Sequence, residues 1–181
     1  MKKILFVVGS LRKESFNRQL AKEAEALLQG KAEIAYLDYT SLPFVNQDEE
    51  VPEHAEVARV RKAVSEADAL WVFTPEYNFS YPGLVKNLFD WLSRPVTPGD
   101  YATPTCINGK KVALSGAGGK AATSQCRKKL TDLLAFIKAD VLDVQTGIAL
   151  QPECWTSNKL VLTDEDRAHL QQEADALISE L

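Results

Sequence analysis

Four side chains that could bind an anion follow the first apolar run of the chain, residues 4–8: Ser10, Arg12, Ser15 and Asn17. The apolar run is typical of a buried strand, and a helical pattern of apolar residues starts directly after the four polar side chains. The first turn of a helix has unpaired N–H groups that attract negative charge. The pattern therefore fits a phosphate site, and it equally fits an ordinary strand–turn–helix corner in which Ser15 caps the helix.

Two further segments that follow predicted strands have the composition of ligand-binding loops. Residues 75–83 contain three aromatic side chains among turn residues, which suits a flat ring with polar edges. Residues 115–119 are almost free of side chains, so their backbone can approach a ligand closely. Taken alone, this second segment could be a simple tight turn, because it lacks the spacing of the dinucleotide fingerprint. A phosphate site beside a ring site describes a mononucleotide or flavin mononucleotide (FMN).

Apolar strand-like segments alternate with helical patterns along the whole chain. Strands are predicted at residues 4–8, 32–39, 69–74, 111–115 and 141–144, with 146–150 as a continuation of the last. Helices are predicted from Phe16, from Pro52 at a first helical position, over 84–92, over 121–138, and after a Thr163 cap. Residues 116–119 are predicted to form a turn, and residues 95–108 an irregular excursion.

This alternation predicts right-handed βαβ units and a parallel sheet with helices on both faces. We predict an α/β fold of the flavodoxin-like type, a three-layer sandwich with a five-stranded parallel sheet in the order 2-1-3-4-5; a truncated dinucleotide-binding fold is the alternative. No linker or repeat divides the chain, so residues 1–181 are predicted to form a single domain. In this strand order, strands 1, 3 and 4 are neighbours, and the three loops described above converge on one crevice.

Composition excludes several classes of function. The net charge of −4 argues against nucleic-acid binding, and no apolar run approaches the length of a membrane helix, so we predict a cytoplasmic protein without a membrane partner. Three widely spaced cysteines and two histidines predict neither a metal site nor a disulfide framework. Cys126 is interpreted as a small buried side chain, with redox activity as the alternative.

Two long segments resemble the signature motifs of the NADPH-dependent FMN reductase family. Residues 9–21 resemble GSxRxxSxNxxLA, residues 74–91 are similar to TPEYNxSxPGxLKNxxDW, and residues 109–113 resemble the GKxVA entry to the fourth strand. Two long motifs in the same order and spacing are far more specific than a glycine pattern. Two departures are the long segment 95–108 and Tyr81, whose position is commonly aliphatic in the family.

The resemblance implies a flavodoxin-like fold, bound FMN, and NADPH or NADH as electron donor. It implies two-electron reduction of a small-molecule acceptor by a ping-pong hydride mechanism, the acceptor being a quinone, chromate, an azo compound or free flavin. It also implies a homodimer or homotetramer in which the helix over 84–92 contributes to the interface and a second subunit completes the pocket.

Carried over position by position, the resemblance assigns the FMN phosphate to Ser10, Arg12, Ser15, Phe16 and Asn17. It assigns the ribityl chain and ring to Pro75, Glu76, Tyr77, Asn78 and Ser80, and the pyrimidine side to Ser115, Gly116, Ala117, Gly118 and Gly119. Tyr77, Asn78 and Arg12 are the catalytic candidates, because they could order the substrate or attract the phosphates of the nicotinamide cofactor. Phe16 and Ser80 could instead only pack and cap, and Glu76 could brace its loop.

Two other functions remain open at the level of sequence. A flavodoxin-type electron carrier would have the same fold but no turnover of its own, and its first loop is rich in Thr and Gly rather than Ser and Arg. A flavin-free binding or regulatory protein could also use this scaffold.

Overall fold

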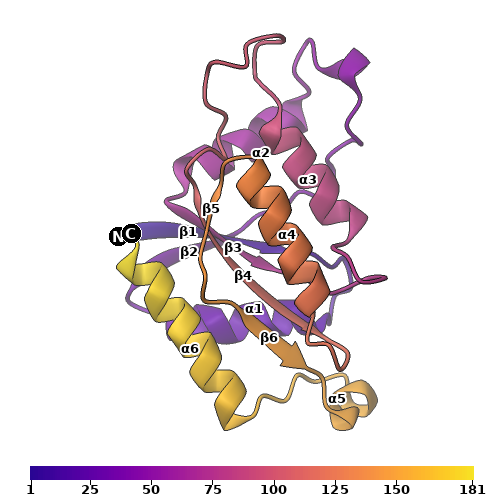
Figure 1. The fold of residues 1–181 in the computed structure, drawn as a ribbon, viewed down its shortest axis with the longest axis vertical. Helices are drawn as coiled ribbons and strands as arrows, with labels where there is room; N and C mark the ends of the chain where they lie inside the picture. The colour runs from indigo at the N-terminus through magenta and orange to yellow at the C-terminus, as the bar shows by residue number, and fades with distance from the viewer.

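A computed structural model describes all 181 residues of the chain, and one parallel sheet runs through its centre (Figure 1). Its main path follows the order β2-β1-β3-β4-β5, so the predicted strand order is confirmed. These strands are β1 (Lys2–Val8), β2 (Ala32–Tyr36), β3 (Ala69–Phe73), β4 (Lys111–Gly118) and β5 (Asp140–Val141). A sixth strand, β6 (Thr146–Ala149), also pairs with β4.

Helices cover both faces of the sheet and complete the predicted three layers. One face packs against α1 (Phe16–Leu27) and α6 (Asp164–Ser179). The other packs against α2 (Ala55–Glu66), α3 (Gly83–Ser93) and α4 (Ser124–Phe136). The chain also contains the short helix α5 (Pro152–Ser157) and the 3₁₀ turn η1 (Gln47–Glu49).

The central strand β1 shows why its sequence is continuously apolar. Ile4, Phe6 and Val8 belong to the core beneath α1 and α6, whereas Leu5 and Val7 belong to the core on the opposite face. Successive side chains of a strand point to opposite faces, so a strand that is covered twice needs apolar residues at every position. The carboxyl end of β1 is therefore held firmly from both sides.

Two predicted helix caps are confirmed, and one predicted helix start is wrong. The Ser15 hydroxyl accepts a hydrogen bond from the N–H of Arg18 and caps α1, and Thr163 forms a capping box at the start of α6. Pro52 does not begin α2. This helix starts three residues later because the His54 side chain accepts the N–H of Glu56 and acts as its cap.

The glycine-rich segment after residue 115 differs from its prediction. Residues 116–118 are part of β4 rather than of a turn, because β6 pairs with them from Ser115↔Thr146 to Gly118↔Ala149. The predicted fifth strand is also not continuous. It is divided into β5 and β6, which pair with the beginning and the end of β4.

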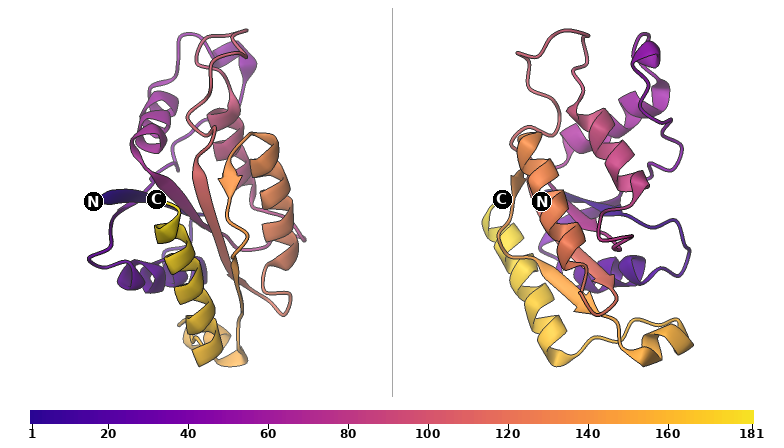
Figure 2. Two further views of the ribbon diagram at one scale, coloured as in Figure 1. Left: turned by 60° about the vertical axis from the view of Figure 1, so that its left-hand side comes forward. Right: turned by 45° about the vertical axis from the view of Figure 1, so that its right-hand side comes forward.

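The two ends of the molecule differ in structure. Residues 95–108 are irregular, as predicted, and project from one end together with the loop that contains η1 (Figure 2). The short helix α5 lies at the opposite end, where β4 and β6 finish (Figures 1 and 2). None of the helices combines the length and the apolar character that crossing a bilayer requires.

Candidate functional site

A cavity of about 380 Å³ lies at the carboxyl ends of β1, β3 and β4. The three loops that were singled out in the sequence meet here, as the strand order requires. From these loops the lining residues are Ser10, Arg12, Ser15, Phe16, Asn17, Pro75, Glu76, Tyr77, Ala117, Gly118 and Gly119. Four residues assigned by resemblance are not among the lining residues: Asn78, Ser80, Ser115 and Gly116.

The loop after β1 offers hydrogen-bond donors that nothing in the protein uses. The N–H groups of Phe16 and Asn17, in the first turn of α1, have no hydrogen-bond partner in the chain. The Ser15 hydroxyl accepts one hydrogen bond as a cap, which leaves its own proton available for donation. These donors lie at the positive end of the helix, so their chemistry suits an anionic group.

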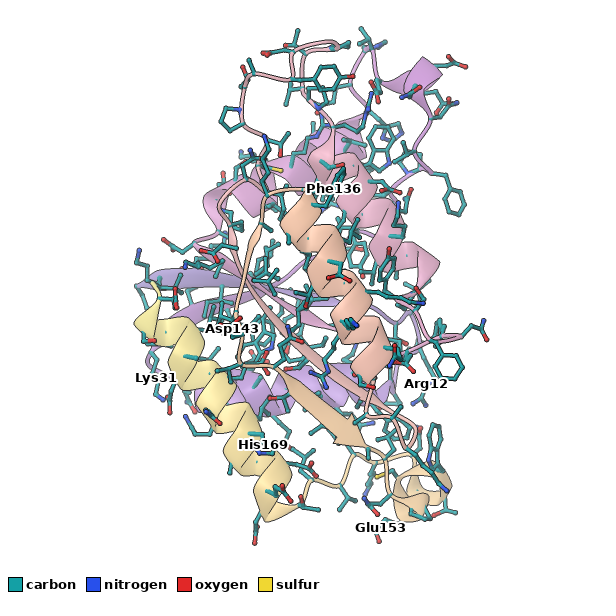
Figure 3. The ribbon with its side chains drawn as sticks, in the orientation of Figure 1. Arg12, Lys31, Phe136, Asp143, Glu153 and His169 are labelled. Carbon is teal, nitrogen blue, oxygen red and sulfur yellow. The ribbon has the colours of Figure 1, made fainter.

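Arg12 adds a full positive charge to this loop. Its guanidinium carbon lies 5.0 Å from the centre of the Phe16 ring, which fits a cation–π contact. Its Nη1 donates a hydrogen bond to Oδ1 of Asn158. Figure 3 places Arg12 near the end of the molecule that carries Glu153 of α5, far from Phe136 at the end of α4.

Asn17 joins the first loop to the end of β4. Its Nδ2 donates to the carbonyl of Ala117 at 3.0 Å, and the N–H of Ala117 donates back to its Oδ1 at 2.8 Å. Both polar atoms of this buried side chain are therefore engaged within the protein. The side chain fixes the distance between two walls of the cavity, and the backbone N–H of Asn17 remains available to an anion.

The loop after β3 contains a tight hairpin. Tyr77 and Ser80 exchange two backbone hydrogen bonds of 2.9 and 3.0 Å, and Asn78 and Phe79 between them have positive φ angles of 52° and 59°. Tyr77 lines the cavity with 53% of its surface exposed, whereas Asn78 is not among the lining residues.

Glu76 has a structural contact as well as a place on the cavity. Its Oε2 accepts a hydrogen bond of 2.8 Å from the N–H of Cys126, in the first turn of α4. A carboxylate at this position satisfies an otherwise unpaired donor of the helix. Glu76 therefore braces the loop after β3 against α4, in line with the alternative interpretation of its sequence position.

The Ser115 side chain does not reach the cavity, which corrects its assignment. It is fully buried, accepts a hydrogen bond of 2.9 Å from Nε1 of Trp71, and donates one of 2.7 Å to Oε2 of Glu173. Alternate residues of β4 point to opposite faces, and Ser115 points toward α6. Gly116 is needed for packing, because a Cβ there would lie only 2.5 Å from the carbonyl oxygen of Thr74.

Glu173 is the buried acid beneath this end of β4. Burial raises the pKa of its carboxyl to about 7, although hydrogen bonds from Thr146 and Ser115 and the charge of Arg127 act in the opposite direction. The folded protein is therefore more stable when the Glu173 carboxyl is protonated than when it is ionised.

Sequence reasoning missed three residues that line the cavity: Leu150, Trp155 and Asn158. Trp155 lies on α5, and its ring packs edge-on against Phe16 with centroids 5.3 Å apart. Pro152 at the first position of α5 was a usable signal for this helix. Nothing in the local sequence showed that α5 returns to the first loop, because that contact depends on how β6 is placed.

Comparison with known proteins agrees with this geometry. The family model described as NADPH-dependent FMN reductase matches residues 2–152. The chain belongs to this family. FMN is accordingly its cofactor, and an NAD(P)H-dependent reductase activity is the activity of its family. The donor set of the first loop fits the phosphate of this cofactor.

Three relatives illustrate the relationship. The NAD(P)H-dependent FMN reductase PA1204 of Pseudomonas aeruginosa is 32% identical over 178 residues, which cover 97% of this chain and 92% of that protein. The 2-hydroxy-1,4-benzoquinone reductase of a Burkholderia species is 45% identical over 94 residues, about half of each protein (51% and 51%). The solved structure of FerB, a flavoenzyme NAD(P)H:(acceptor) oxidoreductase from Paracoccus denitrificans, superposes with a TM-score of 0.85 at 29% identity and covers 99% of this chain and 96% of that one.

Proposed function

We propose that this chain is an FMN-dependent NAD(P)H oxidoreductase that transfers two electrons, by a ping-pong hydride mechanism, to quinones, chromate, azo compounds or free flavin. The observation that carries the proposal is the meeting of three unlike loops in one cavity: a cationic loop with free N–H donors, an aromatic loop and a glycine-rich strand end. In this proposal residues 1–181 act as a single FMN-binding domain.

The chemistry of the three walls supports one orientation of the cofactor. Ser10, Arg12, Ser15 and the N–H groups at the start of α1 would bind the phosphate, because they are the cationic and donor-rich part of the cavity. The ring would lie toward Pro75, Tyr77 and residues 117–119, where aromatic surface and accessible backbone allow a flat group to approach.

FMN supplies the hydride chemistry when it is bound, and the protein binds and orients the reactants. No side chain is required as a nucleophile. Tyr77 is half exposed at the cavity and is placed to order a flat substrate, while Asn78 would act only from the outer turn of the same hairpin. Arg12 is also available to attract the phosphates of the nicotinamide cofactor.

A quinone is the acceptor class that the relatives favour, since one of them is named a 2-hydroxy-1,4-benzoquinone reductase. A quinone takes up two electrons and two protons to become a hydroquinone, so its needs match the two electrons of one hydride. Chromate, azo compounds and free flavin belong to the same proposal and are separated from quinones by experiment.

We further propose that the chain acts as a homodimer or homotetramer in which α3 contributes to the interface. The support is the family resemblance of the α3 sequence. Sedimentation of the FMN-loaded protein at micromolar concentration tests this, and a single monomeric species would contradict it. A cytoplasmic location remains a prediction from the sequence.

The proposal is tested by anaerobic reduction of the purified, FMN-loaded protein with NADPH, and separately with NADH. We expect the yellow flavin absorbance to bleach with one equivalent of donor and to return when a quinone is added. The same sample is then tested with chromate, an azo dye and free FMN. Failure of the protein to bind FMN, or bleaching without multiple turnover with any acceptor, would contradict the proposal, and the second result would indicate an electron carrier.

A further inference from the structure

The segment of residues 151–160 lies against the loop after β1 and contacts Arg12, the only arginine of that loop. This segment contains α5 and the residues after it, and all but its first two residues lie beyond residues 2–152, the part matched by the family model. Trp155 and Asn158 of this segment line the same cavity as Arg12. The C-terminal part of the chain therefore contributes to a site whose other residues all come from the matched part.

Asn158 holds the Arg12 guanidinium through one hydrogen bond. Its Oδ1 accepts from Nη1 of Arg12. A guanidinium has five N–H donors, so this contact leaves most of them available to a ligand. The same guanidinium lies over the Phe16 ring, and Trp155 packs edge-on against that ring. Arg12 is thus held from two sides although its side chain is exposed.

Gln19 on α1 fixes Asn158 in turn. Its Nε2 donates to the carbonyl oxygen of Asn158 at 3.1 Å, and its Oε1 accepts the N–H of Leu160 at 2.7 Å. Asn158 has a φ of 56°, a left-handed conformation that asparagine tolerates better than most residues. One side chain of α1 therefore holds the backbone on both sides of residue 159, from which the Asn158 side chain reaches Arg12.

We propose that Gln19 and Asn158 are positioning residues that hold Arg12 ready for the phosphate of FMN, and that the chain selects FMN over riboflavin partly through this contact. The inference rests on the proposed placement of the phosphate. Holding an arginine in place before binding removes part of the side-chain entropy that its ordering would otherwise cost. The benefit is confined to ligands that carry the phosphate.

The test compares the dissociation constants of FMN and riboflavin, measured by flavin fluorescence on the apoprotein. The main variant is Asn158→Gly, because glycine keeps the left-handed backbone and removes the amide. Gln19→Ala is the second variant. Thr156→Ala is the matched control, since the Thr156 hydroxyl is exposed and bonds only to Glu153 of its own helix.

We expect Asn158→Gly and Gln19→Ala to weaken FMN binding about tenfold and to leave riboflavin binding unchanged, with no change in the control. Unchanged FMN affinity in Asn158→Gly, or equal losses for FMN and riboflavin, would overturn the inference. If riboflavin binds too weakly to titrate, the FMN affinities of the variants and the unchanged protein are compared, provided that the apoproteins have equal melting temperatures. A loss of FMN affinity at equal melting temperature then supports the inference, and an unchanged FMN affinity overturns it.

Arg12→Ala separates this inference from the proposed function. If Arg12→Ala lowers the preference for FMN and Asn158→Gly does not, the positioning role is wrong and the phosphate placement stands. If Arg12→Ala itself leaves the preference for FMN unchanged, Arg12 does not bind the phosphate, and the proposed contact of Arg12 with the cofactor is wrong.

Discussion

Two polar networks, at the ends of β1 and β4, support the same cavity in opposite ways. The network after β1 consists of Arg12, Asn158 and Gln19, is exposed, and points a charge toward the cavity. The network at β4 consists of Trp71, Ser115 and Glu173, is fully buried, and does not touch the cavity.

The difference shows how the two networks divide binding and stability. Exposed ion and amide contacts contribute little to folding but can place a charge for a ligand. A buried carboxyl group with few partners strongly affects folding and its dependence on pH. Changes in the exposed network should therefore alter the affinity for FMN and leave the free energy of unfolding constant. Changes in the buried network should alter the free energy of unfolding and leave the affinity for FMN constant.

The largest effect is expected from Glu173→Ala in the buried network. The change leaves a cavity and takes away the hydrogen-bond acceptor of Ser115, so it should lower the free energy of unfolding by about 3 kcal/mol. Urea unfolding measures this, with exposed Gln172→Ala as the control on the same helix. FMN affinity of the folded variant should be unchanged, and a tenfold loss of affinity at constant stability would break the distinction.

The pH dependence of stability gives a second test of the buried network. Because burial raises the Glu173 pKa from 4.5 to about 7, the folded protein retains a proton that the unfolded chain releases. The stabilisation is complete below pH 4.5 and is lost as pH rises through 7, by about 3 kcal/mol in total. Glu173→Gln cannot titrate, so the difference in unfolding free energy between the two proteins should vary with pH by this amount. A constant difference from pH 4 to pH 8 would contradict a raised pKa of the buried Glu173 carboxyl.

Gly116 and Gly119, at the end of β4, differ in the space available for a side chain. Gly116→Ala places a methyl group 2.5 Å from the carbonyl oxygen of Thr74, whereas a Cβ at Gly119 has nothing within 4 Å. We expect Gly116→Ala to destabilise the protein by about 2 kcal/mol and Gly119→Ala to leave thermal stability nearly unchanged. Equal melting temperatures would show that β4 is not packed against Thr74 as described.

The exposed network should respond in affinity alone. Arg12→Ala should weaken FMN binding ten- to a hundredfold, because a hydrogen-bonded charge is lost from the phosphate site, with little change in melting temperature. Arg12→Lys is the matched control, since it keeps the charge without the planar donors. Its affinity for FMN should lie between that of the unchanged protein and that of Arg12→Ala. Unchanged FMN affinity together with an unchanged KM for NADPH would remove the role of Arg12.

Much of the fold could be predicted because its signals are local. The apolar runs of the central strands, the Ser15 cap and the capping box at Thr163 each identify an element without reference to distant residues. The end of β4 could not be predicted in this way. Residues 116–118 have the composition of a turn, and they are a strand only because β6, thirty residues later, pairs with them.

The location of the site could be predicted from the sequence in the same way. The three loops follow β1, β3 and β4, which are neighbours in the predicted sheet, so their convergence follows from topology. The direction of individual side chains does not. Ser115 points to α6 because of its position in β4, and the Asn17 side-chain amide is hydrogen-bonded to the backbone of Ala117. The contact of Asn158 with Arg12 joins residues 146 positions apart and has no local signal.

The most direct test of the central claim is a crystal structure of the protein with FMN bound. We predict that the phosphate lies within hydrogen-bonding distance of Arg12, the Ser15 hydroxyl and the N–H groups at the start of α1, with the ring between Tyr77 and residues 117–119. A phosphate bound elsewhere, with this loop free of ligand, would contradict the claim.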